Sequence, residues 1–469
     1  MDPELLYQSI GDLGGMIRRR EVSPVELTAA YLERARTLDP QLFAVVEFTE
    51  ELAMDEARTA ESEIARGRYR GPLHGIPWGV KDLFSTDGIP TQWGSPAFRG
   101  QVFDYDATVV RRMRDAGAVL IAKLSTGELA GGAVWFGGTT RCPWDTGRSS
   151  SGSSAGPGSA TAAGMVGFAV GTETGGSIIS PASVNGVVGL RPTYGRVSRH
   201  GCMAAGWTRD KPGPLCRYVA DAALVLRHLM GADPDDLSAV DAPFDFPPRT
   251  PLPGTKVAIL RNEFEMPLED EVRTIQHAAL GVLEDLGIVI EDIELADLPY
   301  SEVSSLIGAV ESATVWEPLW DSPKRDEFIR SDRGRRWAAG RMIPATDFLK
   351  AERIRVEIMG YASSIFDEYA AIVAPSWMGP AWPWDMPESG PISPTRGDPE
   401  DPDRPRPRIS GFSNLVGIPS VSVPCGFTEA GLPLAIQFLG AAFDEAGILR
   451  LAQAYEQATP WHERHPSLS

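Results

Sequence analysis

The chain has 469 residues and is acidic, with 44 basic and 63 acidic side chains and a net charge of −19. Because nucleic-acid binding needs a basic face, this charge argues against a nucleic-acid partner. The hydrophobic fraction of 43% and the charged fraction of 23% are those of an ordinary globular protein. No linker-like stretch divides residues 1–240, so we expect a single domain over residues 1–469.

The sequence contains few features that indicate a cellular compartment or a bound cofactor. The four cysteines are scattered without a C-x-x-C pair, so reduced buried thiols are expected instead of disulfides or zinc ligands. No H-E-x-x-H motif or His/Asp cluster occurs, so no metal or other cofactor is expected. The N-terminal MDPELLYQSI lacks a signal-peptide pattern. No apolar run approaches the ~18 residues of a membrane-spanning helix. These features predict a cytoplasmic protein with no membrane contact.

Hydrophobic periodicity predicts helices and strands that alternate along the chain. A helical region is expected over 4–38, where Ser23, Pro24 and Glu26 fit a capping box. The apolar stretch 74–80 predicts a strand that ends next to Lys81. Further helices are expected at 50–66, 107–116, 218–230, 268–287 and 443–457, and further strands at 118–124, 256–260, 288–295, 370–374 and 433–440. This alternation is typical of an α/β fold.

Three stretches have unusual compositions. Residues 148–180 are mostly Gly, Ser, Ala and Thr, which would suit a linker. However, the apolar MVGFAV (165–170) lies inside this stretch, so we expect close backbone packing instead. Residues 232–253 predict an exposed connection. Residues 375–407 contain ten of the 39 prolines and predict a long loop, either functional or disordered.

A lysine and two serines are the candidate catalytic groups. Lys81 lies in GIPWGVKDLF (75–84), and Ser153 and Ser177 lie in glycine-rich sequence downstream. A serine nucleophile needs a base, and no histidine occurs between Lys81 and Ser177. A lysine can be that base if burial keeps it neutral, and its neighbours are mostly apolar. Asp82 should point to the opposite face of the strand.

Each serine also has an ordinary interpretation. The GGS that ends at Ser177 follows an apolar stretch, and its backbone N–H groups can converge on an oxyanion. The alternative is a simple glycine turn. Ser153 can relay a proton if it lies between Lys81 and Ser177, and a cis peptide after Gly152 would help to aim it. The alternative is a serine that caps a helix.

Taken together, four motifs carry a family resemblance. GIPWGVKDLF, the Ser-Gly loop SGSSAGPGS (151–159), GTETGGS (171–177) and GVVGLRPTYGRVSRHG (186–201) occur in this order. They resemble the amidase signature family of serine hydrolases, and 24–38, 414–427 and 432–440 are also similar to it. The resemblance implies a mixed central β-sheet flanked by helices on both faces. It also implies a catalytic core at about 70–230 and a variable substrate-pocket region at about 300–410.

The resemblance assigns roles to individual positions. The family's catalytic lysine falls on Lys81, its cis-serine on Ser153 and its nucleophile on Ser177. Its oxyanion amides would come from Thr174, Gly175, Gly176 and Ser177. The implied activity is hydrolysis of a carboxylic amide C–N bond through an acyl-enzyme on Ser177. Two positions depart from the family: the loop at 151–157 is not Gly-Gly-Ser-Ser-Gly-Gly-Ser, and Glu173 stands where an aspartate is common.

Two alternative functions stay open. Residues 152–156 fit G-x-S-x-G, which would make Ser154 the nucleophile of an α/β-hydrolase esterase. That motif should follow a strand, and RCPWDTGRSS (141–150) is a poor one. The second alternative is the glutaminase subunit of the tRNA-dependent amidotransferase. That subunit usually has Arg after GGSI, where this chain has Ile179, and the acidic charge gives no support for a tRNA-bound complex.

Tryptophans suggest the substrate class. Six of the 12 tryptophans fall in 300–410: Trp316, Trp320, Trp337, Trp377, Trp382 and Trp384. The first three fit a helix core, whereas the loop tryptophans suit a substrate wall or lid. We therefore predict a small-molecule substrate, an apolar or aryl amide, anilide or carbamate. The candidate pocket residues are Trp316, Trp320, Trp377, Trp382 and Trp384. Because many similar enzymes are dimers, a homodimer is compatible with the resemblance.

Overall fold

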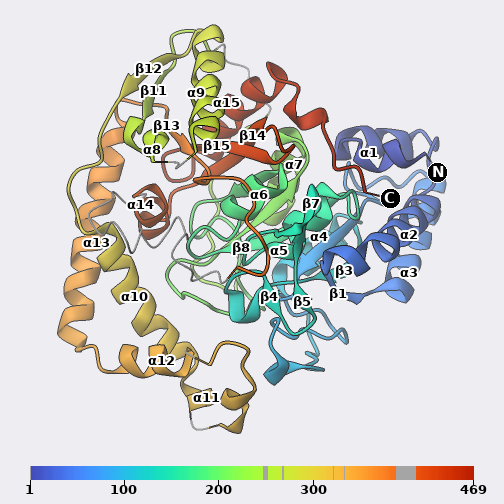
Figure 1. The fold of residues 1–469 in the computed structure, drawn as a ribbon. Coiled ribbons are helices and arrows are strands. Elements are labelled where there is room, and N and C mark those ends of the chain that lie inside the picture. Colours follow the sequence, from blue (N-terminus) through green and yellow to red (C-terminus); the bar gives the residue numbers. More distant parts are fainter. Residues whose placement is uncertain are drawn as a thin grey trace.

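The computed structural model describes residues 2–246, 252–266, 269–320, 322–331, 333–386 and 408–468. An eleven-stranded mixed sheet runs through its centre in the order β1-β3-β2-β8-β10-β9-β14-β15-β13-β11-β12 (Figure 1). The strands are β1 (Val45–Phe48), β2 (Pro77–Lys81), β3 (Val119–Leu124), β8 (Phe168–Glu173), β9 (Val188–Arg191), β10 (Lys211–Cys216), β11 (Lys256–Ile259), β12 (Val289–Asp292), β13 (Ala371–Pro375), β14 (Ser420–Phe427) and β15 (Pro433–Leu439). This mixed sheet confirms the predicted fold class.

Helices cover the sheet on both faces. They are α1 (Ile10–Arg18), α2 (Pro24–Leu42), α3 (Glu50–Ala65), α4 (Thr108–Asp115), α5 (Ala155–Ala162), α6 (Ile179–Asn185), α7 (Val219–Leu229), α8 (Arg261–Glu265), α9 (Asp270–Asp285), α10 (Tyr300–Val315), α11 (Glu317–Trp320), α12 (Arg333–Arg341), α13 (Ala345–Phe366), α14 (Ile409–Val416) and α15 (Glu445–Gln457). Helices α5 and α6 pack together against the sheet, and α4, α7 and α15 form another contiguous layer. None of these helices, within the described residues, is long and apolar enough to cross a lipid bilayer.

The single helical region expected over 4–38 is divided. A 3-10 helix at Pro3–Tyr7 is followed by α1 and α2 as separate helices. The chain turns between them, with Arg20 in the left-handed region at φ 60°. Ser23 then begins α2 as predicted, because its hydroxyl accepts the amides of Val25 and Glu26 and Pro24 follows it. A new cap in the middle of a continuous apolar pattern therefore starts a new helix.

The small-residue stretch 148–180 is ordered, as predicted. It contains α5 and β8, and several of its glycines lie where another chain segment approaches closely. A Cβ on Gly152 would lie 2.0 Å from the carbonyl oxygen of Gly132, and a Cβ on Gly171 would lie 2.6 Å from Ser154 Oγ. A side chain at Gly152 would push the Ser153 loop away from Gly132, and one at Gly171 would push β8 away from Ser154.

The segment 141–150, expected to be a poor strand, contains two strands. They are β6 (Arg141–Cys142) and β7 (Asp145–Ser149), which form a small antiparallel hairpin outside the main sheet. The expectation was wrong because a hairpin with one exposed face needs little apolar sequence. A second hairpin joins β4 (Val134–Trp135) and β5 (Gly138–Thr139).

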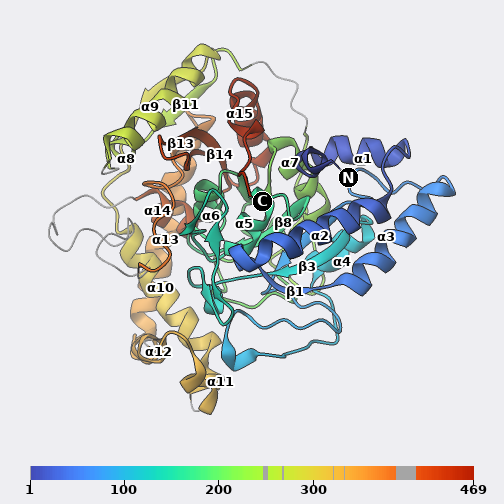
Figure 2. The same cartoon turned by 45° about the vertical axis from the view of Figure 1, so that its right-hand side comes forward.

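Helices α10, α11 and α12 form an arm beside the sheet, here called the α10–α12 arm (residues 300–341). Helix α10 packs against α13, and the part of the arm near α11 lies next to the loop that follows β2 (Figures 1 and 2). The contact is made by two short 3-10 helices, Pro96–Phe98 in the loop and Pro323–Glu327 in the arm. The arm thereby reaches the part of the core that carries Lys81.

Candidate active site

Lys81 is the last residue of β2, which lies between β3 and β8. Its side chain is fully buried, at 0% exposure, and its Nζ is surrounded by oxygen atoms. Ser153 Oγ and Thr172 Oγ1 each lie 2.8 Å away, and Ser154 Oγ lies 3.0 Å away. Burial lowers the pKa of Lys81 to about 7, against smaller opposing effects of Cys202, Asp210 and Glu173. A large share of this lysine is therefore neutral near neutral pH.

The hydrogen bonds around Lys81 indicate where its lone pair points. The Ser154 hydroxyl donates to the Thr172 carbonyl at 3.1 Å and accepts the Thr172 amide at 3.2 Å. Ser154 Oγ can therefore only accept from Lys81, and the Thr172 carbonyl at 3.4 Å can only accept as well. A neutral amine has two N–H groups and one lone pair. With its N–H groups directed to Ser154 and the Thr172 carbonyl, the lone pair can accept from the hydroxyl of Ser153 or of Thr172, which both lie 2.8 Å away.

The charged neighbour of Lys81 in sequence points elsewhere, as predicted. Asp82 faces Lys123 on β3, with Oδ1 3.4 Å from Lys123 Nζ. Its other oxygen accepts the amide of Gln92 at 2.9 Å. Because this buried ion pair lies on the opposite side of the strand, Asp82 does not hold Lys81 in its charged form.

Ser153 follows a cis peptide bond between Gly152 and Ser153, as the family resemblance implies. The loop before it is tied to α6, since the Ser151 hydroxyl donates to Ser180 Oγ at 3.0 Å and the Ser180 hydroxyl lies 3.3 Å from the Gly152 carbonyl. Ser153 is buried and contacts Lys81 directly. The geometry gives Ser153 a proton-accepting neighbour.

Ser177 lies in the turn between β8 and α6. Its carbonyl accepts the amide of Ser154 at 3.2 Å, which places the turn against the Ser153 loop. Unlike Lys81 and Ser153, Ser177 is only half-buried, and Gly175 is exposed. Gly176 has φ 103°, a conformation that favours glycine. The turn that contains the candidate oxyanion amides is therefore partly exposed.

Glu173 and Thr174 hold this turn in place. The Glu173 carboxylate accepts the amides of Ile178 and Ile179 at 2.8 and 3.0 Å and pairs with Arg191 at 2.7 Å. Burial raises the pKa of Glu173, but the charge and hydrogen bonds of Arg191 outweigh burial and keep that pKa below its usual value. The Thr174 hydroxyl donates to Asp210. The longer glutamate therefore caps α6 and anchors the turn to β9.

The candidate pocket tryptophans fall into two separate groups. Trp316 directly follows α10 as its C-cap residue and packs in an apolar cluster with Leu83, which is two residues after Lys81. Trp377 and Trp382 stack on each other at 6.0 Å and pack against Val184, near the C-terminal end of α6. Trp384 lies under the guanidinium of Arg141, outside both groups. Trp320 is the last residue of α11, and its side chain lies outside the described part of the structure.

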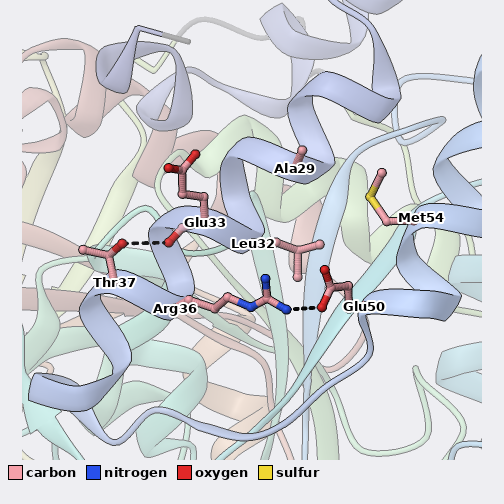
Figure 3. Close-up of a pocket in the computed structure, with 7 residues that line it drawn as sticks. All are labelled: Ala29, Leu32, Glu33, Arg36, Thr37, Glu50 and Met54. Atoms are coloured by element: carbon pink, nitrogen blue, oxygen red, sulfur yellow. Dashed lines mark hydrogen bonds and ion pairs between the residues drawn. The ribbon is translucent and has the colours of Figure 1, made fainter.

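Ser154 contacts Lys81, whereas a separate surface hollow is lined by none of the candidate catalytic residues. Ser154, the alternative nucleophile, is fully buried with its hydroxyl engaged by Thr172. A surface hollow lies between α2 and α3, where Arg36 pairs with Glu50 and Leu32 faces Met54 (Figure 3). No candidate catalytic residue lines this hollow. Residues 387–407, within the long loop expected at 375–407, lie outside the described residues.

The mixed sheet and the Lys81–Ser153 pair agree with the resemblance that the sequence motifs carry, and the family comparison shows the same relationship. The model of the Amidase family matches residues 26–449. The chain belongs to the amidase signature family, and it is therefore a hydrolase that acts on C–N amide bonds.

Individual relatives span almost the whole chain. A glutamyl-tRNA(Gln) amidotransferase subunit of Moorella thermoacetica is 35% identical over 99% of this chain and 99% of that protein. The solved structure of a peptide amidase from Stenotrophomonas maltophilia has a TM-score of 0.82 and 30% identity, covering 98% of each chain. A bacterial aryl acylamidase of this family has a TM-score of 0.87 at 23% identity, covering 97% of each chain, and supports the fold alone.

Proposed function

We propose that the protein hydrolyses a linear carboxylic amide through an acyl-enzyme on Ser177, with Ser153 and Lys81 as the proton relay. The observation that carries this proposal is the fully buried Lys81, whose pKa is lowered to about 7 by burial and whose Nζ lies 2.8 Å from Ser153 Oγ. A general base with a pKa near the working pH is deprotonated in a large share of the molecules and is still basic enough to take a proton. The proposed substrate class is an apolar or aryl amide, anilide or carbamate.

The proposed reaction has two halves. Neutral Lys81 takes the proton of Ser153, which takes the proton of Ser177 as its oxygen attacks the amide carbonyl. The amides of Thr174, Gly175, Gly176 and Ser177 stabilise the oxyanion. The C–N bond then breaks, the proton returns through Ser153 to the leaving amine, and an ester on Ser177 remains. Water attacks this ester by the same route, which releases the carboxylic acid and restores Ser177.

Amine release from aliphatic amides, aryl anilides and aryl carbamates tests the proposed activity. We expect the wild-type enzyme to release amine from at least one class, with aryl or other apolar amides preferred over small aliphatic ones. Chromatography of amine and acid together checks that both products form in equal amounts. Hydrolysis of small aliphatic amides alone would contradict the proposed substrate class, whereas no hydrolysis of any class would contradict the activity itself.

A second candidate function is that of a glutaminase subunit in an amidotransferase. The 35% identity to a glutamyl-tRNA(Gln) amidotransferase subunit over almost the whole chain favours it. The buried, apolar Ile179 at the start of α6 speaks against it, because the subunit resembled usually carries an arginine there. Ammonia release from glutamine, with aryl amides beside it, separates the two candidates. A preference for glutamine would favour the glutaminase function.

A further inference from the structure

Three chain segments that lie near the proposed catalytic residues meet in one apolar cluster. The first segment follows Lys81 and contributes Leu83. The second contains Leu129 and Ala130, shortly before Gly132, which packs against Gly152. The third contains Cys202 and Met203, and Cys202 lies close enough to Lys81 to affect its pKa. The cluster therefore borders chain segments next to Lys81 and next to the Ser153 loop.

The centre of this cluster is a row of aromatic rings that belong partly to the core and partly to the α10–α12 arm. Trp93 comes from the core, and its amide donates to the Asp82 carbonyl at 3.2 Å. Its ring lies 4.6 Å from Phe98 and 6.1 Å from Trp316 of the arm. Trp316 in turn stacks on Trp337 at 5.8 Å. Trp93 is half-buried whereas Trp316 and Trp337 are buried, so the exposed part of these three rings belongs to Trp93.

A buried carboxylate joins the arm to the core beside this row. Glu128 has 0% exposure, and its Oε1 accepts the Ser95 hydroxyl at 2.9 Å. Its two oxygens also accept the backbone amides of Ile329 and Arg330 in the arm, at 2.9 and 3.1 Å. Arg333, the first residue of α12, lies 3.4 Å from the carboxylate and donates to the Glu128 carbonyl. Burying a carboxylate is costly in free energy. The donors of the arm offset this cost only while the arm is packed against the core.

We propose that Glu128 is a specificity-determining residue, which positions the α10–α12 arm so that Trp316 packs against Trp93 and holds that half-buried ring as a wall for a large apolar or aryl group of the substrate. This inference rests on the proposed function, because it names the substrate group that the site accepts. Glu128 touches no reacting atom in this scheme, and it acts by positioning the arm. Aromatic rings suit such a wall because they supply broad, rigid contact area.

The test compares Glu128→Gln and Trp316→Ala with two matched controls. Glu456→Gln changes another buried acid, whose carboxylate accepts the Val219 amide at 2.8 Å between α7 and α15. Trp135→Ala removes a tryptophan of 7% exposure, against 6% for Trp316, from the β4–β5 hairpin. For each protein, kcat and KM are measured with acetamide, phenylacetamide and acetanilide. The amide bond is common to all three, so the ratio of kcat/KM isolates the aryl group.

We expect the aryl-to-acetamide ratio of kcat/KM to fall about tenfold or more in Glu128→Gln and Trp316→Ala, mainly through KM. The ratio should stay within about threefold of wild type in both controls. Equal losses on all three amides, or an unchanged ratio, would overturn the proposal. If Glu128→Gln does not fold, the comparison of Trp316→Ala with Trp135→Ala decides the outcome.

Binding gives a readout that does not depend on turnover. Isothermal titration of phenylacetamide and acetanilide into Ser177→Ala protein is repeated with the additional change Glu128→Gln. We expect the better of the two ligands to bind about tenfold more weakly in the double variant. If wild type hydrolyses none of the amides but this binding difference holds, the proposed activity fails and the aryl wall stands. Equal binding by both proteins would overturn the wall.

Discussion

Replacing Ser177 with alanine is expected to lower kcat by a factor on the order of 10⁴ to 10⁶, because the attacking oxygen is lost and only binding and oxyanion stabilisation remain. The fold should persist, since Ser177 is half-buried and it is its backbone carbonyl that accepts the amide of Ser154. Amine release measures the loss, and thermal unfolding checks the fold. A loss of kcat smaller than this range would count against Ser177 as the nucleophile, once contamination by wild-type enzyme has been excluded.

Ser154→Ala is the matched control for this experiment. It removes the hydroxyl that the alternative esterase function would need, two hydrogen bonds with Thr172 and one with Lys81. We expect a smaller loss than in Ser177→Ala, because Ser154 only orients the lysine in the proposed scheme. A complete loss in Ser154→Ala together with retained activity in Ser177→Ala would favour Ser154 as the nucleophile.

Replacing Lys81 with methionine is expected to lower kcat/KM by about 10² to 10⁴, the usual contribution of a general base. Methionine fills much of the same space without a charge, so burial favours it and the fold should not suffer. Lys211→Met is the control, since Lys211 is another buried lysine whose pKa is lowered by burial. The control should lose much less activity. Equal losses in the two variants would argue against a specific role of Lys81.

The pH profile of the wild-type enzyme gives an independent view of Lys81. Lys81 acts as a base only when it has lost its proton, and its pKa is lowered by burial to about 7. Activity should therefore fall about tenfold per pH unit below pH 7 and level off above it. The Lys81→Met variant should lack this acid limb. A wild-type profile that stays flat from about pH 5 to pH 9 would contradict the assignment.

Much of the site could be predicted because its signals are local in sequence. The apolar neighbours of Lys81 indicate a buried strand, and strand alternation alone places Asp82 on the far side, where it meets Lys123. The glycines of 148–180 indicate close packing, and the structure shows what they approach. Ser23 and Pro24 mark a helix start that the longer apolar pattern hid. Short-range rules were sufficient in each case.

The remaining features depend on partners distant in sequence. Glu128 lies 201 residues from Ile329, and nothing in the sequence around it indicates that an arm will supply its donors. The role of Glu173 depends on its ion pair with Arg191 of β9. Comparing Glu173 with the aspartate that is common in the family does not reveal this partner. The tryptophans of 300–410 lie in different places, because Trp316 packs in a cluster with Leu83 whereas Trp377 and Trp382, after β13, pack near the end of α6.

The central claim is that Ser177 carries the acyl group, and trapping that group tests it most directly. An aryl amide or anilide that the enzyme hydrolyses is mixed with it, the reaction is stopped with acid during turnover, and the digested protein is analysed by mass spectrometry. Ser154 and Ser177 fall in one tryptic peptide, because no Lys or Arg lies between Arg148 and Arg191, so fragmentation must locate the adduct. The account predicts the acyl mass on Ser177. An adduct on Ser154, with none on Ser177, would contradict it.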